Sequence, residues 1–389
     1  MKKQVVLRKG EEHRLLSGHL WVFSNEIKVV LGSPEAGDVA ELLRHDNKFL
    51  GVGFYNPHSL IAFRLLSREK EEISFEFFER RIAEALQIRH RIYPHAETFR
   101  LVHGEGDFLP GLIVDKYNEF LSVQALSHGM SRRLTLVCDV LESMLHPKAI
   151  VERDESPLRL LEKLEQQKGI LRGTLDQPII SENGIKFKVD LLGGQKTGLF
   201  LDQRENRKAV RRYVRSAAVL DCFCNEGGFS LNASAGGSAS VDAFDISETA
   251  VSRARINATI NQTNGISFNK WDAFEVLKKK VEEGKRYDVV ILDPPSFTRT
   301  RKQVATATRG YKEINSLALQ LLNTGGFLVT ASCSHHVSQE SFFAIIEASA
   351  KSAGRRIRIV ESAGASPDHP VLPSMPETAY LKFVIASVH

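Results

Sequence analysis

Four short apolar runs separated by stretches of helical pattern constrain the fold more than any other feature of this sequence. The runs lie at residues 218–221, 240–245, 287–293 and 326–331. The segments between them read as helices, for example residues 248–261, and residues 380–386 form one more apolar run near the end. Strands that alternate with helices are typical of a doubly wound parallel sheet. We therefore predict an α/β, Rossmann-like domain over residues 189–389.

The first half of the chain has a different pattern. Residues 1–70 contain short strand-like runs separated by Gly, Pro and Asn, which predicts a small β-barrel domain. Residues 71–188 mix both patterns, with a helix over 73–92 and a hairpin at 179–189 that turns at an Asn-Gly pair. We predict a central α+β domain over residues 71–188.

Composition excludes several classes of protein. No apolar run approaches the roughly 18–20 residues that a membrane span needs, and the start does not resemble a signal peptide. The cysteines at 138, 222, 224 and 333 are too few for a disulfide framework, and no second Cys/His pair follows at zinc-site spacing. We expect a cytoplasmic protein with reduced thiols, without a membrane partner and without a metal.

The net charge of +5 permits a polyanionic partner without requiring one. Basic side chains cluster at residues 204–215, 299–312 and 355–358. A solvated helix face and a phosphate-binding surface are both consistent with the first and third clusters. The second cluster follows a motif of chemical interest, so there we favour phosphate contacts.

Acidic side chains end three successive predicted strands, at Asp221, Asp245 and Asp272. Asp221 enters a glycine-containing turn, which lets the backbone approach a ligand at the carboxyl edge of the sheet. Asp245 is placed to accept the hydroxyls of a ribose, whereas Asp272 has two interpretations, an adenine contact or a helix N-cap. The turn is not the dinucleotide G-x-G-x-x-G pattern. Acidic side chains at the strand ends, without a loop that cradles phosphates, suit a nucleoside ligand that carries no phosphate. S-adenosylmethionine is the common ligand of this kind.

Two further motifs indicate what could react at this edge. The Asp-Pro-Pro-Ser run at 293–296 resembles the Asp-Pro-Pro motif of methyltransferases that act on planar nitrogenous substrates, although a structural turn is the alternative. Cys333 directly follows an apolar strand. A thiolate there could add to carbon 6 of a pyrimidine and make carbon 5 nucleophilic, while a small buried cysteine is the alternative.

Together these residues resemble the class I S-adenosylmethionine-dependent methyltransferases that make 5-methylcytosine in bacterial 23S ribosomal RNA. That family is built from a PUA domain, a central domain and a catalytic domain. The motifs that carry the resemblance lie at residues 10–23, 104–115, 194–207, 368–370 and 377–382. The resemblance covers essentially the whole chain. It implies a PUA-like RNA-binding domain at 1–70, S-adenosyl-L-methionine as cofactor, 23S ribosomal RNA as partner, and a homodimer as one assembly that the family permits.

The resemblance also implies roles for individual residues. Cys333 would be the nucleophile, and Asp293 would lie between cofactor and base. The implied cofactor-binding residues are Gln203, Asp221, Phe223, Asn225, Gly227, Gly228, Asp245, Ile246, Asp272 and Asp293. The implied RNA-binding residues are Arg14, Lys196, Arg299, Arg301, Lys302 and Arg309. Ser296 stands where some RNA cytosine-5 methyltransferases have a second cysteine, so the acceptor of the carbon-5 proton is not identified.

Two other functions remain open at this point. The first is an N-methyltransferase acting on guanine in ribosomal RNA, which would need no nucleophile. The second is an RNA-binding protein with a degenerate methyltransferase fold. The motif residues that argue against degeneracy are Asp221, Gly227, Gly228, Asp245 and Asp293.

Overall fold

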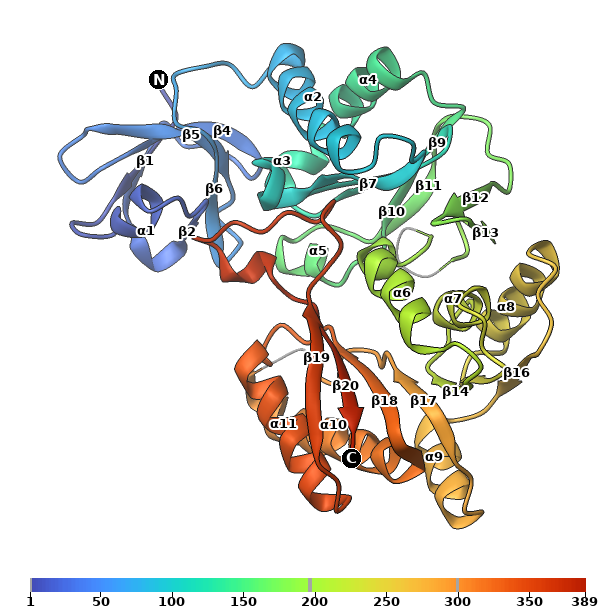
Figure 1. Ribbon diagram of the computed structural model, residues 1–389. Coiled ribbons are helices and arrows are strands. Elements are labelled where there is room, and N and C mark those ends of the chain that lie inside the picture. The colour runs from blue at the N-terminus through green and yellow to red at the C-terminus, as the bar shows by residue number, and fades with distance from the viewer. Residues whose placement is uncertain (1, 195–197, 299–300) are drawn as a thin grey trace. The chain divides into compact units, whose positions relative to one another are not determined.

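The computed structural model describes residues 2–194, 198–298 and 301–389 (Figure 1). These form two compact units, each assembled from three segments of the chain. The segments of the first unit are Met1–Ile180, Val189–Leu201 and Pro367–Thr378. The segments of the second unit are Ser181–Lys188, Asp202–Ser366 and Ala379–His389. Among the described residues, no helix combines the length and the apolar character that a membrane span requires.

The first unit begins with a six-stranded sheet in the order β2-β6-β5-β4-β1-β3. Its strands are β1 (Gln4–Leu7), β2 (Trp21–Phe23), β3 (Ile27–Leu31), β4 (Asp38–Leu43), β5 (Phe49–Tyr55) and β6 (Ile61–Ser67). The short helix α1 (His13–Leu16) contributes Leu15 to the core that these strands enclose. A Cβ at Gly53 of β5 would lie 2.1 Å from the carbonyl oxygen of Arg64 on β6, so this close strand pair requires a glycine.

A second sheet in this unit has the order β11-β10-β9-β8-β7. Its strands are β7 (Thr98–His103), β8 (Leu112–Tyr117), β9 (Phe120–Ala125), β10 (Ala149–Asp154) and β11 (Gln167–Gly173). The helices of this region are α2 (Phe75–Ile92), α3 (His128–Ser131), α4 (Leu134–Leu145) and α5 (Leu158–Leu161). The apolar stripe of α2, with Phe77, Phe78 and Ile82, packs into the core of this sheet, as its spacing predicts.

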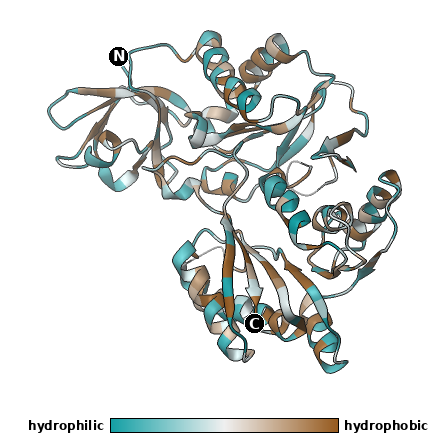
Figure 2. Ribbon diagram, in the orientation of Figure 1, coloured by the Kyte–Doolittle hydropathy of each residue, from teal (hydrophilic) through white to brown (hydrophobic). Residues whose placement is uncertain are grey.

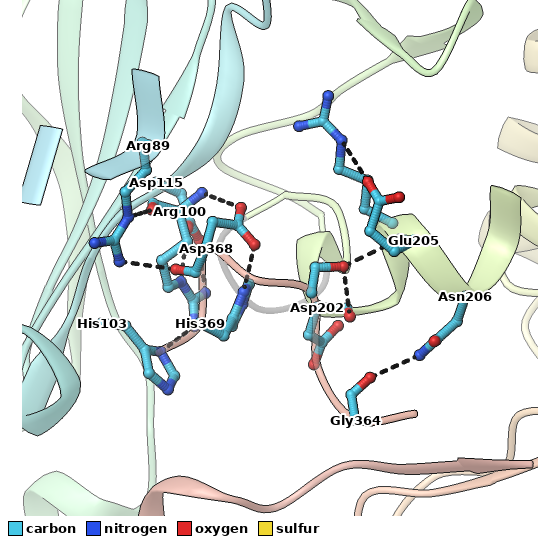
Figure 3. A network of polar contacts seen from close by, with 12 residues as sticks. Arg89, Arg100, His103, Asp115, Asp202, Glu205, Asn206, Gly364, Asp368 and His369 are labelled. Carbon is cyan, nitrogen blue, oxygen red and sulfur yellow. Dashed lines mark hydrogen bonds and ion pairs between the residues drawn. The ribbon is translucent and has the colours of Figure 1, made fainter. Parts of the chain in front are cut away.

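Hydrogen bonds connect Asp368, in a late segment of the chain, to α2 and to the second sheet beside two buried ion pairs (Figure 3). Arg89 donates to both carboxylate oxygens of Asp107, at 2.5 and 2.6 Å, and to the carbonyl of Asp368 at 2.8 Å. The Asp368 carboxylate accepts the backbone N–H of Arg100, whose guanidinium forms a two-pronged pair with Asp115 at 2.8 Å. Each buried charge therefore has a partner, as buried charges require.

The second unit is built on a seven-stranded sheet in the order β16-β15-β14-β17-β18-β20-β19. Its strands are β14 (Ala218–Cys222), β15 (Ser240–Asp245), β16 (Ile266–Lys270), β17 (Tyr287–Leu292), β18 (Leu322–Ser332), β19 (Ile357–Ala363) and β20 (Lys382–Val388). The five strands from β14 to β18 pair in parallel, whereas β20 runs antiparallel to both β18 and β19. This is the predicted Rossmann-like α/β sheet.

Helices cover both faces of this sheet. In Figure 2 its strands carry brown stretches among white and teal ones, and the helices combine teal and brown. One face holds α9 (Ala273–Glu282), α10 (Val304–Leu321) and α11 (Gln339–Ser352). The other holds α6 (Arg204–Val210), α7 (Gly228–Ala235) and α8 (Glu248–Ile260). Successive residues of β17 alternate between the two cores, because side chains of a strand point to opposite faces.

A two-stranded hairpin of β12 (Ile179–Glu182) and β13 (Ile185–Lys188) turns at the predicted Asn-Gly pair, where both residues have positive φ. Its second strand packs on α8. The backbone N–H groups of Lys186 and Lys188 donate to Asn261 and Asn257 at 2.9 Å.

Candidate functional site

Four predicted site residues lie at the carboxyl ends of neighbouring parallel strands. Asp221 lies in β14 and Asp245 ends β15, while Asp293 directly follows β17 and Cys333 directly follows β18. These strands are neighbours in the sheet, so the four residues share one edge. Doubly wound sheets bind their ligands at this edge.

The turn between β14 and α7 is sharply folded. Phe223, Asn225 and Gly227 have φ of 66°, 49° and 85°, so positive φ alternates with ordinary backbone. A Cβ at Gly228 would lie 2.7 Å from Cδ of Arg207, which keeps this position small. The backbone N–H of Asn225 donates to Asp245 at 2.9 Å and thereby ties the turn to the end of β15.

Asp221 is fully buried beneath this turn. Ser230 donates to Oδ2 at 2.5 Å, while the buried Oδ1 has no hydrogen-bond partner among the described residues. Burial, opposed by the Ser230 hydrogen bond and reinforced by the charges of Asp293 and Asp245, raises the pKa of Asp221 to about 7. A buried acceptor without a donor costs free energy, so this oxygen favours a ligand that brings a donor or a positive charge.

Asp245 is oriented by backbone groups. Its Oδ2 accepts from Asn225, and its Oδ1 accepts from the N–H of Ser247 at 2.9 Å. The carboxylate is half-buried, and the next side chain, Ile246, is 66% exposed. The geometry leaves this acid at the surface of the sheet edge, where a polar ligand can reach it.

Asp293 is held by a chain of amides. Gln203 Nε2 donates to Asp293 Oδ1 at 2.8 Å, and Asn206 Nδ2 donates to Gln203 Oε1 at 2.7 Å. Asn206 also donates to the carbonyl of Gly364 at 3.0 Å, a contact that Figure 3 shows. This series of hydrogen bonds through Gln203 and Asn206 fixes the orientation of the Asp293 carboxylate.

Cys333 differs from the other cysteines of the chain. It is half-exposed, and its Sγ lies 4.0 Å from the carbonyl of Pro294 in the Asp-Pro-Pro-Ser loop. Cys138, Cys222 and Cys224 are buried, and burial raises the pKa of each of these thiols. A thiol that stays protonated and inaccessible is unsuited to nucleophilic chemistry, which leaves Cys333 as the candidate.

Hydroxyl groups link the loop of Cys333 to the Asp-Pro-Pro-Ser loop. Ser334 Oγ lies 3.0 Å from both Ser296 Oγ and the hydroxyl of Tyr311 on α10. Ser332 Oγ donates to the same Tyr311 hydroxyl at 3.0 Å. These contacts fix the backbone on either side of Cys333.

Two family models match the chain. The model of the PUA-like domain matches residues 5–68, and the model of the S-adenosylmethionine-dependent methyltransferase matches residues 100–385. The chain belongs to this methyltransferase family.

Curated relatives extend over the full length of the methyltransferase. Proteins named ribosomal RNA large subunit methyltransferase I from Tolumonas auensis and Shewanella frigidimarina are each 39% identical to it. The alignments cover 99% of both chains for the first and 100% of both chains for the second. Among solved structures, a Streptococcus mutans protein described as a SAM-dependent methyltransferase is 20% identical with a TM-score of 0.84, covering 99% of this chain and 100% of that one. The last comparison supports the fold.

The cofactor of the methyltransferase is S-adenosyl-L-methionine, and the residues at the sheet edge fit it. The unpartnered Oδ1 of Asp221 suits an ammonium or hydroxyl donor, and Asp245 suits a ribose. The glycines of the turn leave room for close approach of a ligand to the backbone.

The structure separates the two interpretations of Asp272 only in part. Its Oδ1 accepts the N–H groups of Phe274 at 2.9 Å and Glu275 at 3.2 Å, so Asp272 is the N-cap of α9. The capping role that the sequence left as an alternative is present. An adenine contact through the same carboxylate stays a prediction.

The first basic cluster is divided between buried and exposed side chains, and Lys208, Arg212 and Arg215 are exposed. Arg204 and Arg207 are each only 4% exposed, and Arg207 forms a two-pronged pair with Glu182 at 2.9 and 2.7 Å. Arg211 donates to Asn232 at 2.8 Å. The interpretation as a solvated helix face therefore holds for the exposed half of the cluster, whereas the buried half packs within the second unit.

The predicted RNA-binding residues have varied settings. Lys302 lies in the 3-10 turn that precedes α10 and Arg309 lies on α10, and both are exposed. Arg14, in the first unit, donates to Glu26 at 2.6 Å and stacks over the ring of Phe23. Lys196, Arg299 and the side chain of Arg301 lie outside the described residues.

Several residues of the site escaped sequence reasoning, namely Asn206, Tyr311, Ser334 and Lys382, whose Nζ donates to the carbonyl of Ser334 at 2.6 Å. The signal for Asn206 and Lys382 was their position inside motifs at 194–207 and 377–382. Nothing in the sequence singles out Tyr311.

We predict that Asp221→Asn changes how stability depends on pH. The folded carboxyl has a pKa of about 7, against 3.8 for the ordinary group, so its contribution to stability is present below pH 4 and is lost as pH rises through 7. Asparagine removes this loss. At pH 8 and without cofactor, the variant should be more stable than wild type by on the order of 2–4 kcal/mol, with little difference at pH 4. Thermal unfolding across this range measures the effect, and parallel pH curves for both proteins would contradict it.

Proposed function

We propose that this methyltransferase forms 5-methylcytosine in large-subunit ribosomal RNA through a covalent bond from Cys333. The observation that carries the proposal is a half-exposed cysteine at the carboxyl end of β18, beside the Asp-Pro-Pro-Ser loop. The names of the full-length relatives support ribosomal RNA of the large subunit as substrate.

The proposed cofactor site is the edge described above. The turn with Phe223, Asn225, Gly227 and Gly228 would hold the methionine part, above Asp221. Asp245 and Ile246 would contact the ribose, and Asp272 would contact the adenine. Gln203 would contribute to cofactor binding by orienting the carboxylate of Asp293. When bound, S-adenosylmethionine supplies a methyl group that a nucleophilic carbon can accept.

The proposed mechanism assigns the attack on the base and the positioning of the base to residues of this chain. The Cys333 thiolate donates an electron pair to carbon 6 of cytosine, which makes carbon 5 nucleophilic towards the methyl group. Asp293 hydrogen-bonds the ring nitrogen or amino group and keeps the base in place. A general base, to which no residue is assigned, then takes the carbon-5 proton. The electron pair of the broken C–H bond restores the double bond between carbons 5 and 6, and the carbon–sulfur bond breaks to release the Cys333 thiolate.

We also propose three domains with distinct tasks. Residues 1–70 would bind RNA through a PUA-like surface that includes Arg14, residues 71–188 would form the central domain, and residues 189–389 would carry out catalysis. A base within folded RNA must leave its stack before it reaches Cys333.

Nucleoside mass spectrometry tests the proposal. Large-subunit ribosomal RNA from cells without this gene is incubated with the purified protein and isotopically labelled S-adenosylmethionine, and the nucleosides are separated. We expect the label in 5-methylcytidine. Label in an N-methylguanosine would favour the alternative chemistry, and the absence of cofactor binding by calorimetry would favour a non-catalytic RNA-binding protein.

We predict that Lys302 and Arg309 contribute to RNA affinity beside the site. The double variant Lys302→Glu and Arg309→Glu should weaken RNA binding by about tenfold or more near physiological salt, and should lower the slope of log K against log salt by about 2. The matched control reverses Lys285 and Arg286, which are exposed directly before β17 at the opposite edge of the sheet. Equal losses in both double variants would mean that the effect is one of net charge only.

A further inference from the structure

Lys382 is a buried lysine beside the loop that carries Cys333. It is the first residue of β20 and pairs directly with Ser332 of β18. The residue is only 4% exposed, which is rare for lysine. Nζ donates to the carbonyl of Ser334 at 2.6 Å and to the carbonyl of Tyr380 at 2.8 Å. Lys382 thus contacts the residues on both sides of Cys333.

The ammonium has an unusual set of partners. Both of these acceptors are neutral carbonyls, and within the described part of the chain the structure gives Lys382 no carboxylate partner. Burial lowers the pKa of Lys382 to about 8, while the charge of a Cys333 thiolate acts in the opposite direction. A buried ammonium without a carboxylate is costly unless it serves an anion nearby. Cys333, when ionised, would be such an anion.

We propose that Lys382 is a positioning residue for the nucleophile, which fixes the turn at residues 332–334 and stabilises Cys333 in its thiolate form. The inference rests on the proposed function of Cys333. It assigns Lys382 no contact with substrate or cofactor. The electrostatic coupling is reciprocal, so removing the ammonium must raise the pKa of the thiol.

Other titratable groups surround this pair. Tyr311 faces it from α10, and Asp293 precedes the proline whose carbonyl contacts Cys333. His335 follows in the same loop and stacks on Tyr380 with ring centroids 5.4 Å apart, and His336 comes next. A comparison of variants at position 382 alone keeps all of these groups constant.

The pH dependence of Cys333 alkylation tests the inference without requiring methyl transfer. The full-length protein is treated with iodoacetamide from pH 6 to pH 10, and modification of Cys333 is followed by mass spectrometry. The other three cysteines are buried, and Cys333→Ser gives the background. We expect Lys382→Met and Lys382→Gln to raise, by about one pH unit, the pH at which Cys333 alkylation reaches half of its maximal rate. Lys382→Arg, which keeps the charge, should titrate near wild type.

The glutamine variant separates charge from hydrogen bonding, because it retains a donor for the two carbonyls. A midpoint in Lys382→Gln equal to that of wild type would overturn the inference. Thermal unfolding and cofactor binding verify that each variant is folded. If the methionine variant does not fold, the glutamine variant alone is sufficient for the test. If Cys333→Ala still formed 5-methylcytosine, the proposed function would fail whatever the alkylation curves show. If Cys333 were essential but the curves coincided, only the role of Lys382 would fail.

Discussion

Cys333→Ala is expected to lower the rate of 5-methylcytosine formation by at least about 10³-fold, because without the thiolate carbon 5 has no route to become nucleophilic. Cofactor affinity should change little, since the acids at the ends of β14 and β15 are untouched. Single-turnover methylation of ribosomal RNA and calorimetry of S-adenosylmethionine binding measure the two quantities separately.

The covalent step itself can be trapped. RNA with 5-fluorocytosine at the target position cannot lose its carbon-5 substituent as a proton, so the wild-type protein should remain attached and migrate slowly in a denaturing gel. Cys333→Ala should give no such band. Cys138→Ala, which alters a buried cysteine of the first unit, is the matched control and should retain it. A persistent adduct in Cys333→Ala would show that another group is the nucleophile.

The same variant separates the two chemistries that the sequence left open. Methylation of a guanine nitrogen requires no attack on the ring, so an N-methyltransferase would keep most of its activity without Cys333. If Cys333→Ala lost about tenfold or less of its methylation activity and the label appeared in a guanosine product, the N-methyltransferase alternative would be favoured.

Local sequence patterns predicted the catalytic fold well. The apolar runs at 218–221, 240–245 and 287–293 correspond to β14, β15 and β17, because buried parallel strands need continuous apolar stretches. Acids directly after such runs are placed at the carboxyl edge by topology alone, which is why Asp245 and Asp293 could be located without coordinates.

Features that depend on distant contacts could not be predicted in this way. The run at 357–363 was not recognised as a strand, and it forms β19 at the sheet edge with mostly half-buried or exposed residues. Lys382 lies inside the run predicted at 380–386 as a polar residue of a strand, and only its place in the folded sheet, paired with Ser332, reveals that it is buried. The density of basic residues along the sequence likewise does not tell a buried arginine from a solvated one. Arg207 is buried because it pairs with Glu182, which lies 25 positions away in the sequence.

Arg207→Met should destabilise the second unit strongly. Arg207 and Glu182 are both nearly inaccessible. Burial lowers the pKa of Arg207, but the charge and hydrogen bonds of Glu182 together with the charges of Asp202 and Asp293 raise it overall. Removal of the guanidinium leaves the Glu182 carboxylate buried and unpaired, a change that costs about 3–5 kcal/mol. Urea unfolding followed by tryptophan fluorescence of Trp271, the tryptophan of the second unit, measures the loss.

The matched control is Arg212→Met, which removes a similar pair with Glu361 at a position where the arginine side chain is 63% exposed. Solvent screens that pair, so its loss should cost about 1 kcal/mol or less.

The double variant Glu182→Leu with Arg207→Met should recover much of the stability, because no buried charge is left without a partner. Since Cδ of Arg207 limits the space beside Gly228, both Arg207 variants should also loosen the turn below the cofactor. Equal costs for Arg207→Met and Arg212→Met would contradict the assignment of the Arg207–Glu182 pair as a structural element of the site.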